Sequence, residues 1–283
     1  MTQTFTLTLS CPERPGIVHA VSSFLLSQYC DIAEHQQFDD TSTRTFFLRT
    51  KFVTADDALT AQRLADLFTA IATEFGMSFR FDDSELPRVV VMVSKMGHCL
   101  NDLIFRWRAG TLGAQLVTVV SNHEVLRPMA EAAGLPFVHI PVTPTTKPEA
   151  EAKLLELVDE LGAELVVLAR YMQVLSDETC QALRGRAINI HHSFLPGFKG
   201  AKPYHQAFDR GVKQVGATAH YVTPDLDEGP IIEQEVIRID HSFDPARLAT
   251  VGQDAEALAL SRAVRWHCEN RVLLHGHRTV VFS

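Results

Sequence analysis

Short, continuous apolar runs alternate with helical stretches through the second part of the chain, and this alternation restricts the fold more than any other feature. The runs occupy residues 89–93, 116–120, 165–168 and 187–190, and the helical stretches occupy 99–108, 124–133 and 150–161. Strands that are apolar along their whole length are buried on both faces, and helices between consecutive strands make those strands parallel. We therefore expect a mostly parallel α/β sheet with its ligand site at the carboxyl ends of the strands.

The first 84 residues follow a different pattern. Residues 5–9 alternate apolar and polar as a half-buried strand does, a helical segment follows, and residues 31–53 suit two strands around a polar turn. A second helical segment is expected to end at Gly76, because glycine adopts the left-handed conformation of a helix C-cap at no steric cost. Residues 77–81 alternate as a fourth strand. The predicted order β-α-β-β-α-β is the ferredoxin-like motif.

A polar segment that ends in Pro87 separates these two patterns. Residues 81–87 are mostly polar and acidic, which is typical of a connection between domains. A chain of 283 residues is also long enough for two hydrophobic cores. We expect domains at residues 1–84 and 85–283.

Composition excludes several classes of protein. The net charge of -8 disfavours a nucleic-acid partner, which normally requires a basic face, and the longest apolar runs are too short to span a bilayer. The N-terminus lacks a basic segment followed by an apolar one, so we expect no signal peptide. The five cysteines are scattered and form no C-x-x-C pair. This cysteine usage predicts free thiols in a reducing cytoplasm, and the short apolar runs predict that the protein has no membrane partner.

Three polar residues at the ends of apolar runs are the best candidates for catalysis. Asn189 and His191 end one run, and Asp227 follows the run at residues 217–222. Alternate side chains of a strand project to the same side, so Asn189 and His191 can face one cleft. An amide, an imidazole and a carboxylate together can move a proton and stabilise an oxyanion. Residues 94–100 form no nucleotide-binding loop, so we expect acyl chemistry without a nucleotide or a metal.

The motifs around these residues resemble the folate-dependent formyltransferase family from about residue 87 to the C-terminus. The motif N-I-H at 189–191 is followed by S-F-L-P at 193–196, and Asp227 follows His191 after 36 residues and precedes G-P-I-I at 229–232. The resemblance implies catalytic roles for Asn189, His191 and Asp227. Residues 168–176 resemble the segment that walls the pterin pocket. The substrate contacts that the resemblance implies are Met172, Gln173, Leu175, His220, Val222 and Asp225.

The N-terminal part resembles an ACT domain. Its element order and the segment C-P-E-R-P-G-I-V at 11–18 carry this resemblance. ACT domains pair through their sheets and bind small metabolites, so the resemblance implies a homo-oligomer and an effector such as an amino acid. Dimerisation alone, without an effector, is an equal alternative.

An ACT domain fused to this fold is the layout of the deformylase branch of the family, which the residues S-K at 94–95 and H-C-L at 98–100 also resemble. The resemblance implies hydrolysis of 10-formyltetrahydrofolate to formate and tetrahydrofolate, in one-carbon metabolism and formate supply for purine synthesis. Relatives that formylate glycinamide ribonucleotide carry a glycine-serine-asparagine loop for the acceptor phosphate, whereas residues 95–98 here hold one glycine and the bulky Met96. Loss of this cradle leaves water as the acceptor.

The expected mechanism uses the folate as substrate and requires no cofactor. A water held by Asp227 attacks the formyl carbon, and protonated His191 with the amide of Asn189 holds the oxyanion. One preorganised oxyanion donor is worth on the order of 3 kcal/mol. A proton then passes to the departing N10 atom.

Two other functions remain open from the sequence. One is a formyltransferase with an amine acceptor, and the other is a noncatalytic sensor of amino acids and folate. A zinc site is not expected, because His191, His192, His205 and His220 match no metal-binding spacing and adjacent histidines of a strand face opposite sides. Lys199, Lys202 and Tyr204 are expected in a solvated loop.

Overall fold

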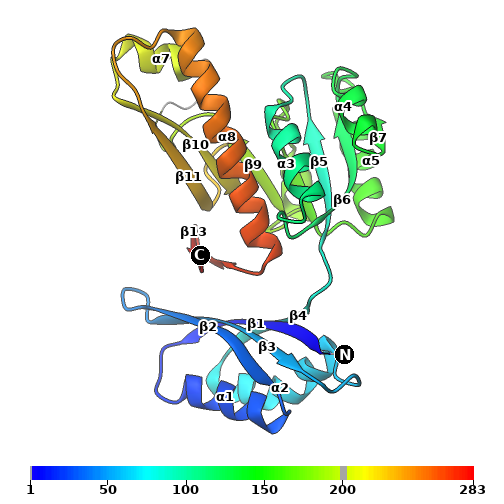
Figure 1. Cartoon of the computed structure of the whole chain (residues 1–283), viewed down its shortest axis with the longest axis vertical. Helices are drawn as coiled ribbons and strands as arrows, with labels where there is room; N and C mark the ends of the chain where they lie inside the picture. The colour runs from blue at the N-terminus through cyan, green and yellow to red at the C-terminus, as the bar shows by residue number, and fades with distance from the viewer. Residues whose placement is uncertain (1, 198–202) are drawn as a thin grey trace. The chain divides into compact units, whose positions relative to one another are not determined.

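The computed structural model describes residues 2–197 and 203–283, which form two compact units (Figure 1). One unit contains the chain up to Glu85 together with Asn270–Leu273 and Val280–Ser283. The other contains Leu86–Glu269 and Leu274–Thr279. The sequence pattern predicts a boundary after residue 84 but places no C-terminal residue in the first unit. That assignment follows from non-local hydrogen bonds such as Arg49 Nε to the carbonyl of Asn270 at 3.1 Å.

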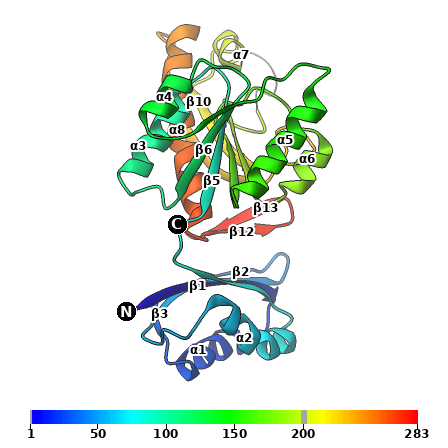
Figure 2. The ribbon, with the colours of Figure 1, turned by 90° about the vertical axis from the view of Figure 1, so that its right-hand side faces the viewer.

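The first unit is a four-stranded antiparallel sheet in the order β2-β3-β1-β4. Its elements are β1 (Gln3–Pro12), α1 (Ile17–Ser27), β2 (Asp31–Asp40), β3 (Thr45–Thr54), α2 (Ala61–Phe75) and β4 (Ser78–Asp83). Both helices cover one face of the sheet (Figures 1 and 2). The predicted element order is thus observed.

The core of this unit lies between the sheet and the two helices. Leu7, Leu48, Leu64 and Phe68 are fully or almost fully buried there, and the ring of Phe24 meets that of Phe68 at 5.0 Å. Helix α2 ends at Gly76 with φ of 64°, which confirms the predicted C-cap.

The second unit is built on a seven-stranded sheet in the order β11-β10-β9-β8-β5-β6-β7. Its strands are β5 (Arg88–Val93), β6 (Gln115–Ser121), β7 (Phe137–His139), β8 (Leu165–Leu168), β9 (Ala187–His191), β10 (Gln214–Tyr221) and β11 (Ile231–Arg238). The five strands β5 to β9 are parallel, whereas β10 runs antiparallel to β9, and β11 antiparallel to β10. The mostly parallel sheet predicted from the apolar runs is confirmed.

Helices cover both faces of this sheet, as doubly buried strands require. They are α3 (His98–Arg108), α4 (Arg127–Ala132), α5 (Lys147–Glu160), α6 (Asp177–Ala182), α7 (Pro203–Asp209) and α8 (Pro245–Cys268). Helices α3 and α8 lie side by side on one face, and α5 and α6 lie on the other (Figure 2). A hairpin of β12 (Val272–His275) and β13 (Arg278–Val281) ends the chain. Within the described residues, no helix is both long and apolar enough to cross a membrane.

Candidate active site

Strands β9 and β10 place the side chains of Asn189, His191 and His220 next to one another. His220 of β10 pairs in register with Asn189 of β9, and Thr218 pairs with His191. Asn189 and His191 are two residues apart, so they project from the same side of the sheet, as the sequence predicts. The side chain of His191 is almost completely buried, since the residue is only 5% exposed to solvent. The site therefore lies at the switch from parallel to antiparallel pairing, where the register of β10 with β11 also shifts between Ala219 and His220.

A tight turn after β10 returns Asp227 to the end of β9. The amide of Glu228 donates to the carbonyl of Asp225 at 3.2 Å, and Asp227 has a left-handed φ of 58°. Gly229 then passes so close to β10 that a Cβ atom would lie 1.7 Å from the carbonyl oxygen of Tyr221. Only glycine fits there without moving the backbone, so Gly229 sets the position of the aspartate.

The carboxylate of Asp227 faces the ring of His191. Asp227 Oδ2 lies 3.2 Å from His191 Nδ1, and the side chain of Asp227 is 12% exposed. The hydrogen bond from His191 lowers the pKa of the Asp227 carboxyl, and partial burial opposes this shift. An ionised carboxylate only accepts, so Nδ1 carries the proton. The opposite ring atom, His191 Nε2, is buried and has no hydrogen-bond partner among the described residues.

His220 orients the amide of Asn189. His220 Nδ1 lies 2.9 Å from the carbonyl oxygen of Tyr221, which can only accept, so Nδ1 carries hydrogen. Burial lowers the pKa of His220, which keeps the ring neutral and leaves Nε2 as an acceptor. Asn189 Nδ2 donates to this Nε2 at 3.3 Å. His220 Nε2 is also 3.8 Å from Asp227, but a neutral ring at that distance forms neither an ion pair nor a hydrogen bond.

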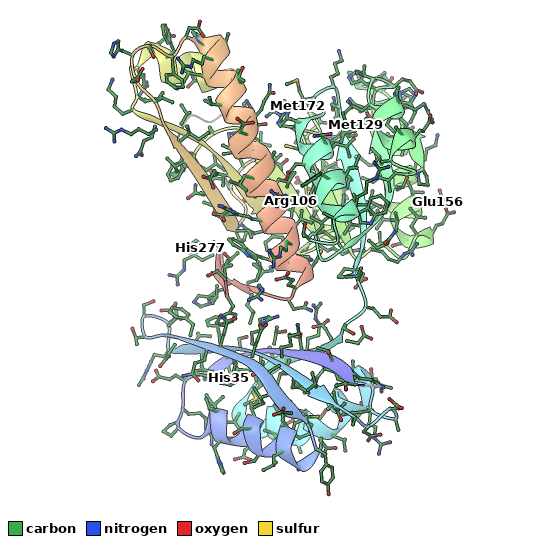
Figure 3. All side chains as sticks on the ribbon, in the orientation of Figure 1. His35, Arg106, Met129, Glu156, Met172 and His277 are labelled. Atoms are coloured by element: carbon green, nitrogen blue, oxygen red, sulfur yellow. The ribbon has the colours of Figure 1, made fainter. Side chains whose placement is uncertain are left out.

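These residues line a cavity of about 420 Å³. Eight of the nine residues predicted for the site lie in its wall: Asn189, His191, Asp227, Met172, Gln173, Leu175, His220 and Val222. The ninth, Asp225, is exposed in the turn and is not part of the wall. Two of the apolar lining residues are accessible to solvent: Leu226 is 61% exposed, and Met172, which Figure 3 labels, is 57% exposed. A flat, partly apolar ligand suits such a wall.

The segment that carries Met172 is held in place by buried polar groups. The amide of Met172 donates to Ser94 Oγ at 3.0 Å, and Ser94 Oγ donates to Asn122 Oδ1 at 2.7 Å. At the other end, Glu151 accepts hydrogen bonds from the amide of Ser176 and, at 2.7 Å, from the hydroxyl of Thr179. Because these groups are buried, the wall of the cavity is fixed from both ends.

Arg170 and His192 also line the cavity, although neither is predicted as a site residue from the sequence. His192 follows the last residue of β9, so the alternation of strand side chains does not apply to it, and its ring lies 5.1 Å from that of His191. The expectation that the two rings face opposite sides is therefore wrong. Burial, with the positive charge of Arg170 second, lowers the pKa of His192 to about 4. Lys199 and Lys202 lie outside the described residues, as do the side chains of Tyr204 and His205.

Arg170 belongs to a buried ionic cluster behind the cavity. Its Nε lies 3.3 Å from Glu256 Oε2 of α8, and the same oxygen lies 2.7 Å from His98 Nε2 at the start of α3. Among the described residues, His98, Cys99 and Glu256 form the one group that could hold a metal ion. Burial raises the pKa of the Cys99 thiol well above its usual value, and the positive guanidinium of Arg170 already lies beside the Glu256 carboxylate. Both effects disfavour a metal.

One family model and several known proteins are similar to this chain. Residues 87–264 match the formyl transferase family. The formyltetrahydrofolate deformylase of Corynebacterium sp. (strain P-1) is 55% identical over 278 residues, which are 97% of this chain and 96% of that protein. The crystal structure of formyltetrahydrofolate deformylase from Burkholderia mallei ATCC 23344 matches with a TM-score of 0.93 and 53% identity, over 99% of this chain and 100% of that one. Glycinamide ribonucleotide transformylase 1 from Symbiobacterium toebii matches with a TM-score of 0.67 and 29% identity, over 72% of this chain and 97% of that one.

Proposed function

The chain belongs to the formyl transferase family and, within it, to the formyltetrahydrofolate deformylases, and from this premise we propose that it hydrolyses 10-formyltetrahydrofolate to formate and tetrahydrofolate. Full-length relatives of that name are 37% to 55% identical to it. The observation that carries the proposal is the contact of His191 with Asp227, 3.2 Å apart and beside Asn189 in one cavity.

Asp227 is proposed to hold the attacking water. Its Oδ2 accepts from His191 Nδ1, which leaves Oδ1 as the oxygen able to accept a hydrogen bond from water. The lowered pKa of Asp227 keeps it ionised at neutral pH, as this role requires. Water adds its oxygen to the formyl carbon, and its proton passes to the carboxylate.

His191 and Asn189 are proposed to stabilise the tetrahedral oxyanion. In the protonated ring that this role requires, His191 Nδ1 donates to Asp227 and Nε2, which is buried and lacks a partner among the described residues, donates to the oxyanion. Asn189 keeps a second amide hydrogen after donating to His220. Each such donor contributes about 3 kcal/mol to transition-state stabilisation. The carbon–N10 bond then breaks, N10 takes a proton through the Asp227–His191 pair, and formate leaves.

The first unit is proposed to be an ACT domain. Its order of elements and its antiparallel sheet support this proposal. Such a domain would join two copies of the chain and bind an effector such as an amino acid. Sedimentation analysis of the whole protein tests for the homo-oligomer. A change in turnover on addition of single amino acids tests for the effector.

Catalysis is proposed to need neither a cofactor nor a metal ion, and to take place in the cytoplasm. Dialysis against a chelator should leave turnover unchanged, with metal content measured before and after. A loss of turnover that one divalent metal restores would contradict the metal-free mechanism. Fractionation of cells would test the compartment.

The direct test of the proposed function is to incubate the protein with 10-formyltetrahydrofolate and no amine. Formate and tetrahydrofolate should appear in equal amounts. A formyltransferase would consume the substrate only when an amine acceptor is added, and a sensor would bind the folate without consuming it.

A further inference from the structure

We propose that Arg170 forms a carboxylate subsite at the reaction centre, which binds the formate that hydrolysis releases. This inference rests on the proposed function, because only hydrolysis produces a free carboxylate at this point. Transfer of the formyl group to an amine yields a neutral formamide instead.

Arg170 is held rigidly in the wall of the cavity. It follows the buried strand β8, and its φ of 63° is left-handed, a conformation that is unfavourable for residues other than glycine. Such a conformation persists only where the surroundings enforce it, and it is concentrated at functional sites. Its side chain is 12% exposed and lines the same cavity as His191 and Asp227.

The guanidinium has more donors than its partner can satisfy. Within residues 2–197 and 203–283, its one ion-pair partner is Glu256, whose Oε2 is shared with His98. Arg170 Nε lies 3.3 Å from that oxygen but is not aligned for a hydrogen bond, and it has no other partner among these residues. A guanidinium offers five N–H groups and binds carboxylates through pairs of them. Donors therefore remain for an anion in the cavity.

The charge of Arg170 acts close to the reacting groups. The ring of His192 lies 5.1 Å from that of His191, and the charge of Arg170 is, after burial, the second cause that lowers the pKa of His192. The formyl group of the substrate is neutral, whereas the product is an anion. A fixed cation at this place therefore favours the hydrolytic product over a neutral formamide, and it disfavours an approaching ammonium group.

Inhibition of turnover by added formate tests the subsite. Arg170→Gln should raise the formate inhibition constant at least about tenfold, which corresponds to about 1.4 kcal/mol. Glu256→Gln removes the counter-charge but leaves the cation, so formate inhibition should stay as strong or become stronger. A purely structural role of the pair predicts instead that both variants weaken formate inhibition together.

Further variants keep the test valid if Arg170→Gln fails to fold. The double variant Arg170→Gln/Glu256→Gln removes both charges of the pair and should also weaken formate inhibition, while Arg170→Lys should retain part of it. The matched control is Arg265→Gln on α8, because Arg265 is 53% exposed and pairs with Glu269 at 2.7 Å. This control should leave formate inhibition unchanged, with chloride used to hold ionic strength constant.

The glutamyl tail of a folate also carries carboxylates that Arg170 could bind, and the same variants distinguish the tail from formate. If Arg170 instead binds the tail, Arg170→Gln will raise KM for 10-formyltetrahydrofolate but not for the analogue that lacks glutamate, and formate inhibition will not change. That result would overturn the inference. So would equal formate inhibition in wild type and Arg170→Gln. Failure of the wild-type protein to release formate would instead refute the proposed function itself.

Discussion

The neutral state of His192 predicts a specific dependence of stability on pH. Burial, aided by Arg170 and His191, lowers the pKa of His192 from 6.5 to about 4. The imidazole of His192 binds a proton more tightly in the unfolded state than in the folded state, so a falling pH lowers the free energy of unfolding. The contribution of His192 is complete above the unfolded pKa and is lost as the pH falls from 6.5 towards 4.

The magnitude follows from the two pKa values. Between neutral pH and about pH 4.5, His192 takes up a proton in the unfolded state but remains mostly neutral in the folded state. The free energy of unfolding therefore falls by about 2 kcal/mol, since one pKa unit corresponds to about 1.4 kcal/mol. The variant His192→Gln cannot take up this proton. Its free energy of unfolding should therefore fall by about 2 kcal/mol less than that of the wild type over the same pH range.

Tryptophan fluorescence in urea can measure this difference in the relevant unit alone. The chain has two tryptophans, Trp107 and Trp266, and both lie in the unit that contains His192. His241→Gln, at an exposed position of the same unit, is the control and should follow the wild type. Equal pH dependence in wild type and His192→Gln would refute the conclusion that His192 is half-buried and neutral.

Three further changes test other parts of the site. Asp227→Asn should lower turnover by about two to four orders of magnitude while folate affinity, measured by fluorescence titration, is retained, because the residue acts on protons rather than on the pterin. Gly229→Ala should displace the turn and lower both the unfolding midpoint and turnover, since the added Cβ would lie 1.7 Å from a backbone oxygen; a normal crystal structure and normal turnover would contradict this. Glu151→Gln should destabilise the unit by roughly 1–3 kcal/mol in urea unfolding, because it weakens the acceptor of the Ser176 amide; an unchanged midpoint would show that this buried carboxylate is dispensable.

Much of the fold could be predicted because local signals agree with it. The apolar runs mark five strands of the second unit, counting β10, and Gly76 marks the end of α2 through a backbone conformation that glycine favours. The strand β7 is not predicted, since three residues are too few for a periodic pattern, and the helices α6 and α7 are not predicted either.

Some residues of the site could be predicted from the sequence and others could not. Alternation along β9 is enough to place Asn189 and His191 together, and the motif spacing brings in Asp227. Glu256 could not be found, because a glutamate within a long helix normally faces solvent, and only the packing of α8 against α3 buries it. Arg170 carries a weak signal, its place just beyond the carboxyl end of a buried strand. Its ion-pair partner Glu256 lies 86 residues further along the chain, at 256 against 170, so the local sequence gives no sign of the pair.

Hydrolysis in water labelled with oxygen-18 tests the central claim most directly. With 10-formyltetrahydrofolate as the only substrate, the released formate should carry one labelled oxygen per molecule, and Asp227→Asn should abolish its formation. Formate that lacks the label, or a formyl group recovered only on an added amine, would contradict water as the acceptor and Asp227 as the residue that holds it.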